Sequence, residues 1–201
     1  MTTTELIVES YFRLCRKCFT LSDVKVINGN NRQFDLLAFR LPTPSEPQQQ
    51  YHVEVSVIHE LGWNSNSEQL IQSFEKKFFG KVDKNSKEKG DYAKGKSYQE
   101  DIFKTYESVG FDPKKVSRVW VCWTVNEKDC ISPALDKFCT EKNLPLGSIE
   151  VISFRDRIMP DLQKVVGTAN YADDALRTFS LIEQRRLQLE SEDRRRVKKT
   201  E

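Results

Sequence analysis

The segment from Val116 to Val125 reads Val-Ser-Arg-Val-Trp-Val-Cys-Trp-Thr-Val, which is nearly continuously apolar and rich in β-branched and aromatic residues. This composition is typical of a strand that is buried on both faces, because a half-exposed strand alternates apolar with polar residues. Such a strand needs neighbouring strands on its edges and helices over both faces. The segment therefore predicts a central strand of a layered α/β fold.

Apolar spacing and turn residues place the other elements around this strand. They predict the order α-β-β-β-α-α-β-α-β-α-α. Helices are expected over residues 5–19, 64–79, 98–109, 132–142 and 155–166 and from 171 onward, and strands over residues 24–27, 34–39, 51–58, 116–125 and 149–154. We thus expect an α/β fold in which helices flank a mixed β-sheet, with a helical extension at the C-terminus.

The length of 201 residues suits one domain with a tail better than two full domains. We expect residues 1–166 to form this domain and residues 167–201 to form a C-terminal helix and a charged tail. Residues 80–97 are rich in Lys, Gly and Ser, which predicts a mobile basic insertion within the domain.

The sequence contains no run that approaches the roughly 18 apolar residues of a membrane-spanning helix, and no signal peptide opens it. We therefore expect a soluble protein without a membrane partner. Its expected location is intracellular, in the cytoplasm or with the chromosome in a nucleoid or nucleus.

The overall charge excludes a chain that binds polyanions through a strong general field, since 32 Lys and Arg face 30 Asp and Glu for a net charge of +2. A nucleic-acid site must therefore be local. Residues 76–96 hold eight Lys and three acidic residues, and the candidate DNA contacts there are Lys76, Lys77, Lys81, Lys84, Lys87 and Lys89. A solvated surface loop explains the same charges equally well.

The five cysteines are an odd number and are spread along the chain, unlike a secreted disulfide framework. Cys15 and Cys18 form a Cys-x-x-Cys pair, but they fall within the predicted first helix. A zinc site needs two further ligands, and no second tight pair of Cys or His residues follows. Ordinary buried thiols are the favoured interpretation.

Three acidic residues lie on elements expected to neighbour one another: Glu9 (or Glu5) on the first helix, Asp35 in the second strand and Glu54 in the third. A carboxylate such as Asp35 in a half-buried strand carries a desolvation cost that a metal or hydrogen bonds must offset. Glu54 and Ser56 share one face of their strand, because side chains alternate. Adjacent strands would bring Asp35 and Glu54 together, and converging carboxylates hold Mg²⁺ or Mn²⁺.

Each of these acids also has an ordinary structural explanation. Asp35 can end a turn, Glu54 can pair with a neighbouring Lys or Arg, and Glu9 can be solvated. The three acids in this order on these elements are what favours a metal site.

The segment from Glu5 to Phe154 resembles the PD-(D/E)XK, or restriction-endonuclease-like, nucleases, nearest the branch of archaeal Holliday-junction resolvases. The resemblance rests on a first helix with an acidic residue, a Gly/Asn turn, the strand Phe34-Asp-Leu-Leu-Ala and the strand His52-Val-Glu-Val-Ser56. It implies an αβββαβ core and metal-dependent hydrolysis of DNA phosphodiester bonds. It also implies that Asp35, Glu54 and the backbone of Val55 bind Mg²⁺ or Mn²⁺, with Glu9 as an additional acid.

Ser56 departs from this family pattern, which has a catalytic Lys at the same position. A hydroxyl group cannot supply the positive charge that orients the attacking water and neutralises developing charge. Either another residue substitutes, with Lys25, Lys76, Lys77 and Lys81 as candidates, or the site is weakened or inactive.

The leading prediction is therefore a divalent-metal-dependent DNA endonuclease. The alternative is an inactive nuclease-fold domain that binds nucleic acid or a protein partner. A third hypothesis is that the final helix docks on another chain, as in a homodimer, through an apolar stripe of Ala175, Leu176, Phe179, Ile182 and Leu189. Packing of that stripe within the same chain is the commoner explanation.

Overall fold

The computed structural model describes residues 2–29, 31–58, 64–82 and 97–197. The described strands are β1 (Phe19–Lys25), β2 (Gln33–Arg40), β3 (Gln49–Ser56), β4 (Ser117–Cys122) and β5 (Ile149–Ser153). The described helices are α1 (Thr3–Leu14), α2 (Ser67–Phe78), α3 (Gln99–Ser108), α4 (Ile131–Glu141), α5 (Met159–Val166) and α6 (Asp174–Val197). A five-residue π-helix, η2 (Phe154–Ile158), precedes α5. The predicted order of helices and strands is confirmed.

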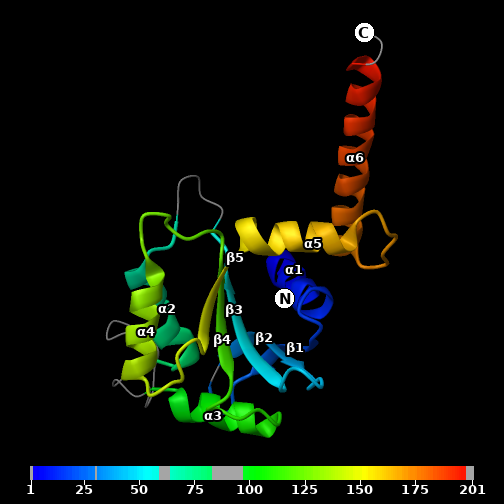
Figure 1. Ribbon diagram of the computed structural model, residues 1–201. Helices are drawn as coiled ribbons and strands as arrows, with labels where there is room; N and C mark the ends of the chain where they lie inside the picture. The colour runs from blue at the N-terminus through cyan, green and yellow to red at the C-terminus, as the bar shows by residue number, and fades with distance from the viewer. Residues whose placement is uncertain (1, 30, 59–63, 83–96, 198–201) are drawn as a thin grey trace.

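The five strands form one mixed sheet in the order β1-β2-β3-β4-β5. The first three strands are antiparallel to one another, and β3, β4 and β5 run parallel. Figure 1 shows α2 and α4 on one side of the sheet and α1 and α5 on the other, while α3 covers the lower end. The predicted α/β class with a mixed sheet flanked by helices is therefore confirmed.

Strand β4 is buried on both faces, as its composition predicted. Val119 and Val121 pack in the cluster beneath α1 and α5, whereas Trp120 and Cys122 pack against α2 and α4. The strand ends at Cys122, three residues before the predicted end. It lies between β3 and β5, so β3 is the central strand of the sheet.

The first helix ends at Leu14, earlier than predicted, and the first strand begins at Phe19 instead of Val24. Lys17 adopts a left-handed backbone conformation with φ of 58°, which a right-handed helix cannot contain. The backbone N–H of Cys18 donates to the Phe12 carbonyl at 3.0 Å and closes the helix end. Cys15 and Cys18 therefore lie beyond the helix, which corrects the sequence-based prediction. All five cysteines are free thiols.

Hydrogen bonds join the two chain segments that flank the predicted basic insertion. The Tyr98 N–H donates to the Gly80 carbonyl at 3.0 Å, and Ser97 Oγ donates to the Phe79 carbonyl at 2.7 Å. Gly80 has φ of +61°, and a Cβ atom there would lie 2.5 Å from the Cβ of Tyr98, so only glycine fits. Residues 83–96, and with them Lys84, Lys87 and Lys89, lie outside the described residues.

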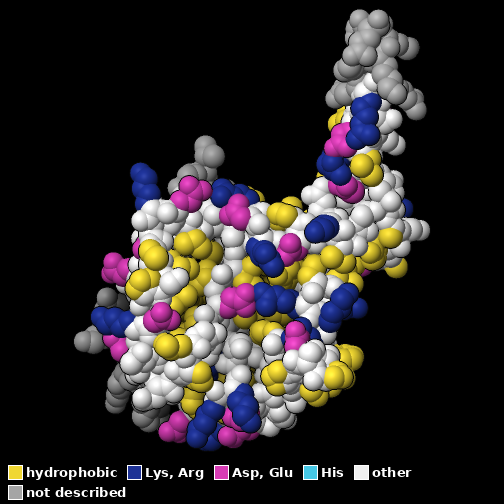
Figure 2. Space-filling view, viewed as in Figure 1, with side chains coloured by type: hydrophobic (Ala, Val, Ile, Leu, Met, Phe, Trp, Pro, Cys, Tyr) yellow, Lys and Arg dark blue, Asp and Glu magenta, His cyan; other side chains and the backbone are white. Residues whose placement is uncertain are grey.

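The C-terminal helix α6 leaves the body of the protein, as Figure 1 shows. The predicted apolar stripe is divided: Leu176 and Phe179 are buried in the core, whereas Ile182 and Leu189 are 55% and 44% exposed. Figure 2 shows basic, acidic and apolar side chains interleaved along this helix. Within the described ranges, no helix has the length and apolarity needed to cross a membrane.

Candidate active site

The candidate active site lies where strands β2 and β3 separate. Their pairing ends at Leu36 and Val53, and the next residues in register are Asp35 and Glu54. Beyond that point Oδ2 of Asp35 accepts a hydrogen bond from the backbone N–H of Val55 at 2.7 Å. The separation of the strands thus opens a place for a carboxylate beside β3, and Asp35 is held there.

The regular alternation of side chains along β2 is interrupted next to Asp35. Phe34 packs with Leu37 in the cluster under α3, whereas Leu36 and Ala38 pack in the cluster under α1. In regular strand geometry Phe34 and Leu36 would share a face. The local change in backbone direction is what turns Asp35 toward the third strand.

Glu54 is 1% exposed and has a different partner for each carboxylate oxygen. Oε1 lies 2.8 Å from Nε2 of His52, and Oε2 lies 2.6 Å from Nζ of Lys77 on α2. Burial alone would raise the pKa of Glu54, but the hydrogen bond from His52 and the charge of Lys77 outweigh it and lower the pKa. Glu54 is therefore a buried carboxylate that stays ionised.

His52 connects Glu54 to α3. Its Nδ1 lies 2.7 Å from the Tyr106 hydroxyl, and both residues are fully buried. Burial lowers the pKa of His52 and raises the pKa of Tyr106, so the neutral imidazole accepts the Tyr106 proton at Nδ1 and donates Nε2–H to Glu54. These two residues fix the orientation of the Glu54 carboxylate.

The roles of His52 and Tyr106 were missed by the sequence analysis. The alternation of β3 already places His52 and Glu54 on one face, two residues apart. That spacing was the available signal for His52. Nothing in the sequence pattern links Tyr106 to β3, because the contact depends on how α3 packs.

Lys77 on α2 supplies a positive charge against Glu54, whereas β3 itself has Ser56 in place of the lysine of the family pattern. Burial would lower the pKa of Lys77, but the charge of Glu54 outweighs it and raises the pKa, so the ammonium is retained. Its side chain is 42% exposed and reaches the buried carboxylate from the helix above. Among the four predicted substitutes for the missing lysine, Lys77 is the one whose ammonium contacts Glu54.

The environment of Asp35 disfavours its ionised form. Burial and, next, the negative charge of Glu54 raise its pKa from 3.8 to about 6, against the opposing effects of the Val55 N–H and of Lys77. Two carboxylates that repel each other in this way form a favourable place for a cation. Their oxygens are hard ligands of the type that Mg²⁺ and Mn²⁺ prefer.

The acids of α1 do not complete a three-carboxylate group. Oε1 of Glu9 accepts a hydrogen bond from Thr20 Oγ1 on β1 at 2.7 Å. Glu5, rather than Glu9, is the α1 acid whose charge contributes to the raised pKa of Asp35. Within the described ranges, no three His, Cys, Asp or Glu side chains are placed to hold a metal ion together. The expected Glu9, Asp35 and Glu54 group is therefore corrected to a pair, Asp35 and Glu54.

The donor set still fits a divalent cation bound by two carboxylates. Oε2 of Glu54 is buried, and the Lys77 ammonium at 2.6 Å is its partner in the described structure. An ionised carboxylate has about four lone-pair sites, so Glu54 can accept from His52 and Lys77 and still contact a cation. Val55 contacts this site through its backbone N–H, which donates to Asp35, and its role in binding a metal stays a prediction.

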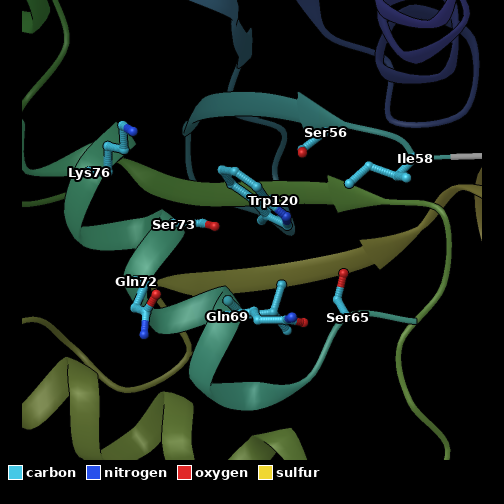
Figure 3. A pocket seen from close by; sticks show the side chains of 9 residues that line it. Ser56, Ile58, Ser65, Gln69, Gln72, Ser73, Lys76 and Trp120 are labelled. Atoms are coloured by element: carbon cyan, nitrogen blue, oxygen red, sulfur yellow. The ribbon is translucent and has the colours of Figure 1, made fainter. Parts of the chain in front are cut away.

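The remaining predicted residues lie around this pair. Ser56 and Lys76 line a cavity of about 330 Å³ between the sheet and α2 (Figure 3). Lys81 pairs with Glu75, and Lys25 is exposed at the end of β1. Lys84, Lys87 and Lys89, which were predicted as contacts to DNA, lie outside the described residues.

Comparison of the chain with protein-family models, with curated proteins and with solved structures found no match. The geometry around Asp35, Glu54 and Lys77 is therefore the basis from which a function can be inferred.

Proposed function

We propose that this protein is a divalent-metal-dependent endonuclease of the PD-(D/E)XK type that hydrolyses phosphodiester bonds in DNA. The observation that carries the proposal is the 2.6 Å separation between Lys77 Nζ and Glu54 Oε2, beside Asp35. The site thus contains two carboxylates and an ammonium group, which are the chemical groups that the sequence resemblance requires.

Asp35 and Glu54 would hold Mg²⁺ or Mn²⁺, together with the carbonyl oxygen of Val55. When bound, the ion would lower the pKa of a water molecule and stabilise negative charge on the scissile phosphate. Lys77 orients the attacking water and offsets the negative charge that develops on the phosphate. His52 and Tyr106 keep Oε1 of Glu54 occupied, so that Oε2 is directed to the reaction.

The fold supports the same proposal. One helix is followed by three antiparallel strands, and after helices α2 and α3 a fourth strand pairs parallel to the third. This order is compatible with the αβββαβ core that the resemblance implies, with one additional helix between the third and fourth strands. The paired acids lie on the second and third strands of that order, where the motif places them.

The test is cleavage of DNA in Mg²⁺ or Mn²⁺ by the wild type and by Asp35→Asn, Glu54→Gln and Lys77→Met. We expect each substitution to lower kcat by about 100-fold or more, as removal of a group that stabilises the transition state does. Lys115→Met is the matched control, because Lys115 is 81% exposed and pairs only with Asp112 among the described residues. Equal cleavage by all variants would identify a contaminating nuclease and overturn the proposal.

The second candidate is a nuclease-fold domain that binds DNA without cutting it. Ser56 at the lysine position and a pair of acids in place of a triad favour this function. It predicts salt-dependent DNA binding that is unchanged by Asp35→Asn, with no cleavage under any divalent cation.

A further inference from the structure

A cavity of about 330 Å³ adjoins the candidate active site, between the carboxyl ends of β3 and β4 and helix α2. Two of its lining residues, Ser56 and Lys76, lie close in the sequence to the proposed catalytic groups. Ser56 follows Glu54 by two residues on the same face of β3, which is about 7 Å along the strand, and Lys76 precedes Lys77 on α2. The distance is comparable to the length of one nucleotide along an extended strand.

The cavity exists because small side chains face each other across it. Figure 3 shows Ser56 on β3 and Ser73 on α2 on opposite sides of the Trp120 ring, with Gln69 extending toward Ser65. Larger residues at Ser56 and Ser73 would fill the space between sheet and helix. The volume lies at the lower end of the range for small-molecule sites, which begins at about 300 Å³.

The lining offers hydrogen bonds that the protein itself does not use. Trp120 is 6% exposed, yet its indole N–H takes part in no hydrogen bond within the described part of the chain. The hydroxyl groups of Ser56 and Ser73 are likewise without partners there. The indole N–H of Trp120 is not one of the fully buried polar atoms that lack a partner, so it is open to the cavity and to water. It can therefore donate to an acceptor that enters the cavity, as the two hydroxyl groups can.

The chemistry of the lining selects among the ligands of this size. Among the described residues no carboxylate lines the cavity, and apart from the Lys76 ammonium its polar groups are neutral hydroxyls, amides and an indole N–H. The aliphatic side chains of Leu70 and Ile58 complete the lining. Neutral donors and acceptors beside apolar surface match a nucleobase, whose edge is polar and whose faces are flat.

We propose that this cavity binds one unpaired nucleobase of DNA, next to the phosphate that is bound at Glu54 and Lys77. The proposal rests on the proposed nuclease function and specifies its substrate as DNA with a single-stranded or extruded nucleotide. A base that is stacked and paired within a duplex cannot enter a space between a sheet and a helix without leaving the stack.

The test measures DNA affinity by fluorescence anisotropy in Ca²⁺, which replaces Mg²⁺ to prevent cutting. The probes are a single-stranded oligonucleotide and the blunt duplex of the same sequence. We expect the wild type to bind the single strand about tenfold more tightly than the duplex, because the contacts of one bound base contribute about that factor to the affinity. Ser73→Leu, which fills the cavity, is expected to abolish this preference, and Ser56→Leu fills it from the opposite wall if Ser73→Leu does not fold.

Ser191→Leu is the matched control, because Ser191 is exposed on α6, and it is expected to keep the preference. Equal affinity of the wild type for both probes, or a preference that survives both filling variants, would overturn the nucleobase pocket. Competition by a free mononucleotide as strong as that by the strand would also overturn it. Cleavage in Mg²⁺ is scored separately, so loss of hydrolysis with an intact strand preference counts against the nuclease function alone.

Discussion

Lys77 on α2 holds its ammonium nitrogen 2.6 Å from Oε2 of Glu54 on β3. The two residues are 23 positions apart in the sequence, and a helix over the sheet brings them together. The contact places a positive charge against Glu54 on a strand that has Ser56 two residues further on. In the proposed nuclease, Lys77 would take the role that the family assigns to a lysine on that strand.

The first prediction is a rescue. Lys77→Met is expected to lower the rate of Mg²⁺-dependent cleavage at saturating DNA by about 100-fold. Adding Ser56→Lys to that variant is expected to restore at least about tenfold, because the new ammonium approaches Glu54 from its own strand. Ser56→Lys alone is expected to give no gain, since Lys77 already supplies the charge. A large gain from Ser56→Lys alone, with no effect of Lys77→Met, would contradict this role of Lys77.

The second prediction concerns Asp35, whose pKa is raised from 3.8 to about 6. The folded protein binds this proton more tightly than the unfolded chain, so the free energy of unfolding falls as the pH rises from about 4 to 6. Asp35→Asn removes the effect and keeps an acceptor for the Val55 N–H. Without metal, we expect it to stabilise the protein by about 1–2 kcal/mol at pH 7 and by much less at pH 4.

Urea denaturation in EDTA at both pH values measures this difference. Addition of Mg²⁺ at pH 7 is expected to stabilise the wild type and to have little effect on Asp35→Asn. Lower stability of Asp35→Asn at pH 7 would show that the ionised carboxylate is favourable in the folded protein, contrary to this account.

The strand composition and the order of elements were sufficient to predict the α/β fold and to place Asp35 and Glu54 on adjacent strands, while their use as metal ligands stays a prediction. Adjacent strands with known faces leave few alternatives for two residues at the same level. The sequence could not single out Lys77 from the other candidate lysines as the partner of Glu54. That contact depends on how α2 is rotated over the sheet. The end of the first helix was misplaced because residues 15–18 continue its apolar spacing, while Lys17 takes a left-handed conformation.

The third prediction tests the support of Glu54 by α3. Tyr106→Phe leaves Nδ1 of buried His52 without its donor, which costs about 1–3 kcal/mol in the free energy of unfolding. Tyr171→Phe is the matched control, since Tyr171 packs half-buried against the core and makes no hydrogen bond through its hydroxyl within the described residues. If the denaturation curves show the same small change for both variants, the Tyr106 hydroxyl does not support His52, and these two residues do not position Glu54.

The fourth prediction separates conformation from space at Gly80. Gly80→Ala combines a positive φ with a Cβ atom 2.5 Å from Tyr98 Cβ, and we expect it to destabilise the protein by about 3 kcal/mol. Gly147→Ala has φ of +77° and nothing within 4 Å, so its expected cost is about 1 kcal/mol. Thermal or chemical denaturation compares them. Equal costs would mean that the chain at Tyr98 moves to accommodate the added methyl group.

The most direct measurement of the central claim is anomalous diffraction from crystals of the protein soaked in Mn²⁺. The account predicts one strong peak between the carboxylates of Asp35 and Glu54, with the Lys77 ammonium beside it and no such peak in crystals of Glu54→Gln. A peak at another place, or none at saturating Mn²⁺ while Lys77 stays against Oε2 of Glu54, would contradict a metal-dependent nuclease.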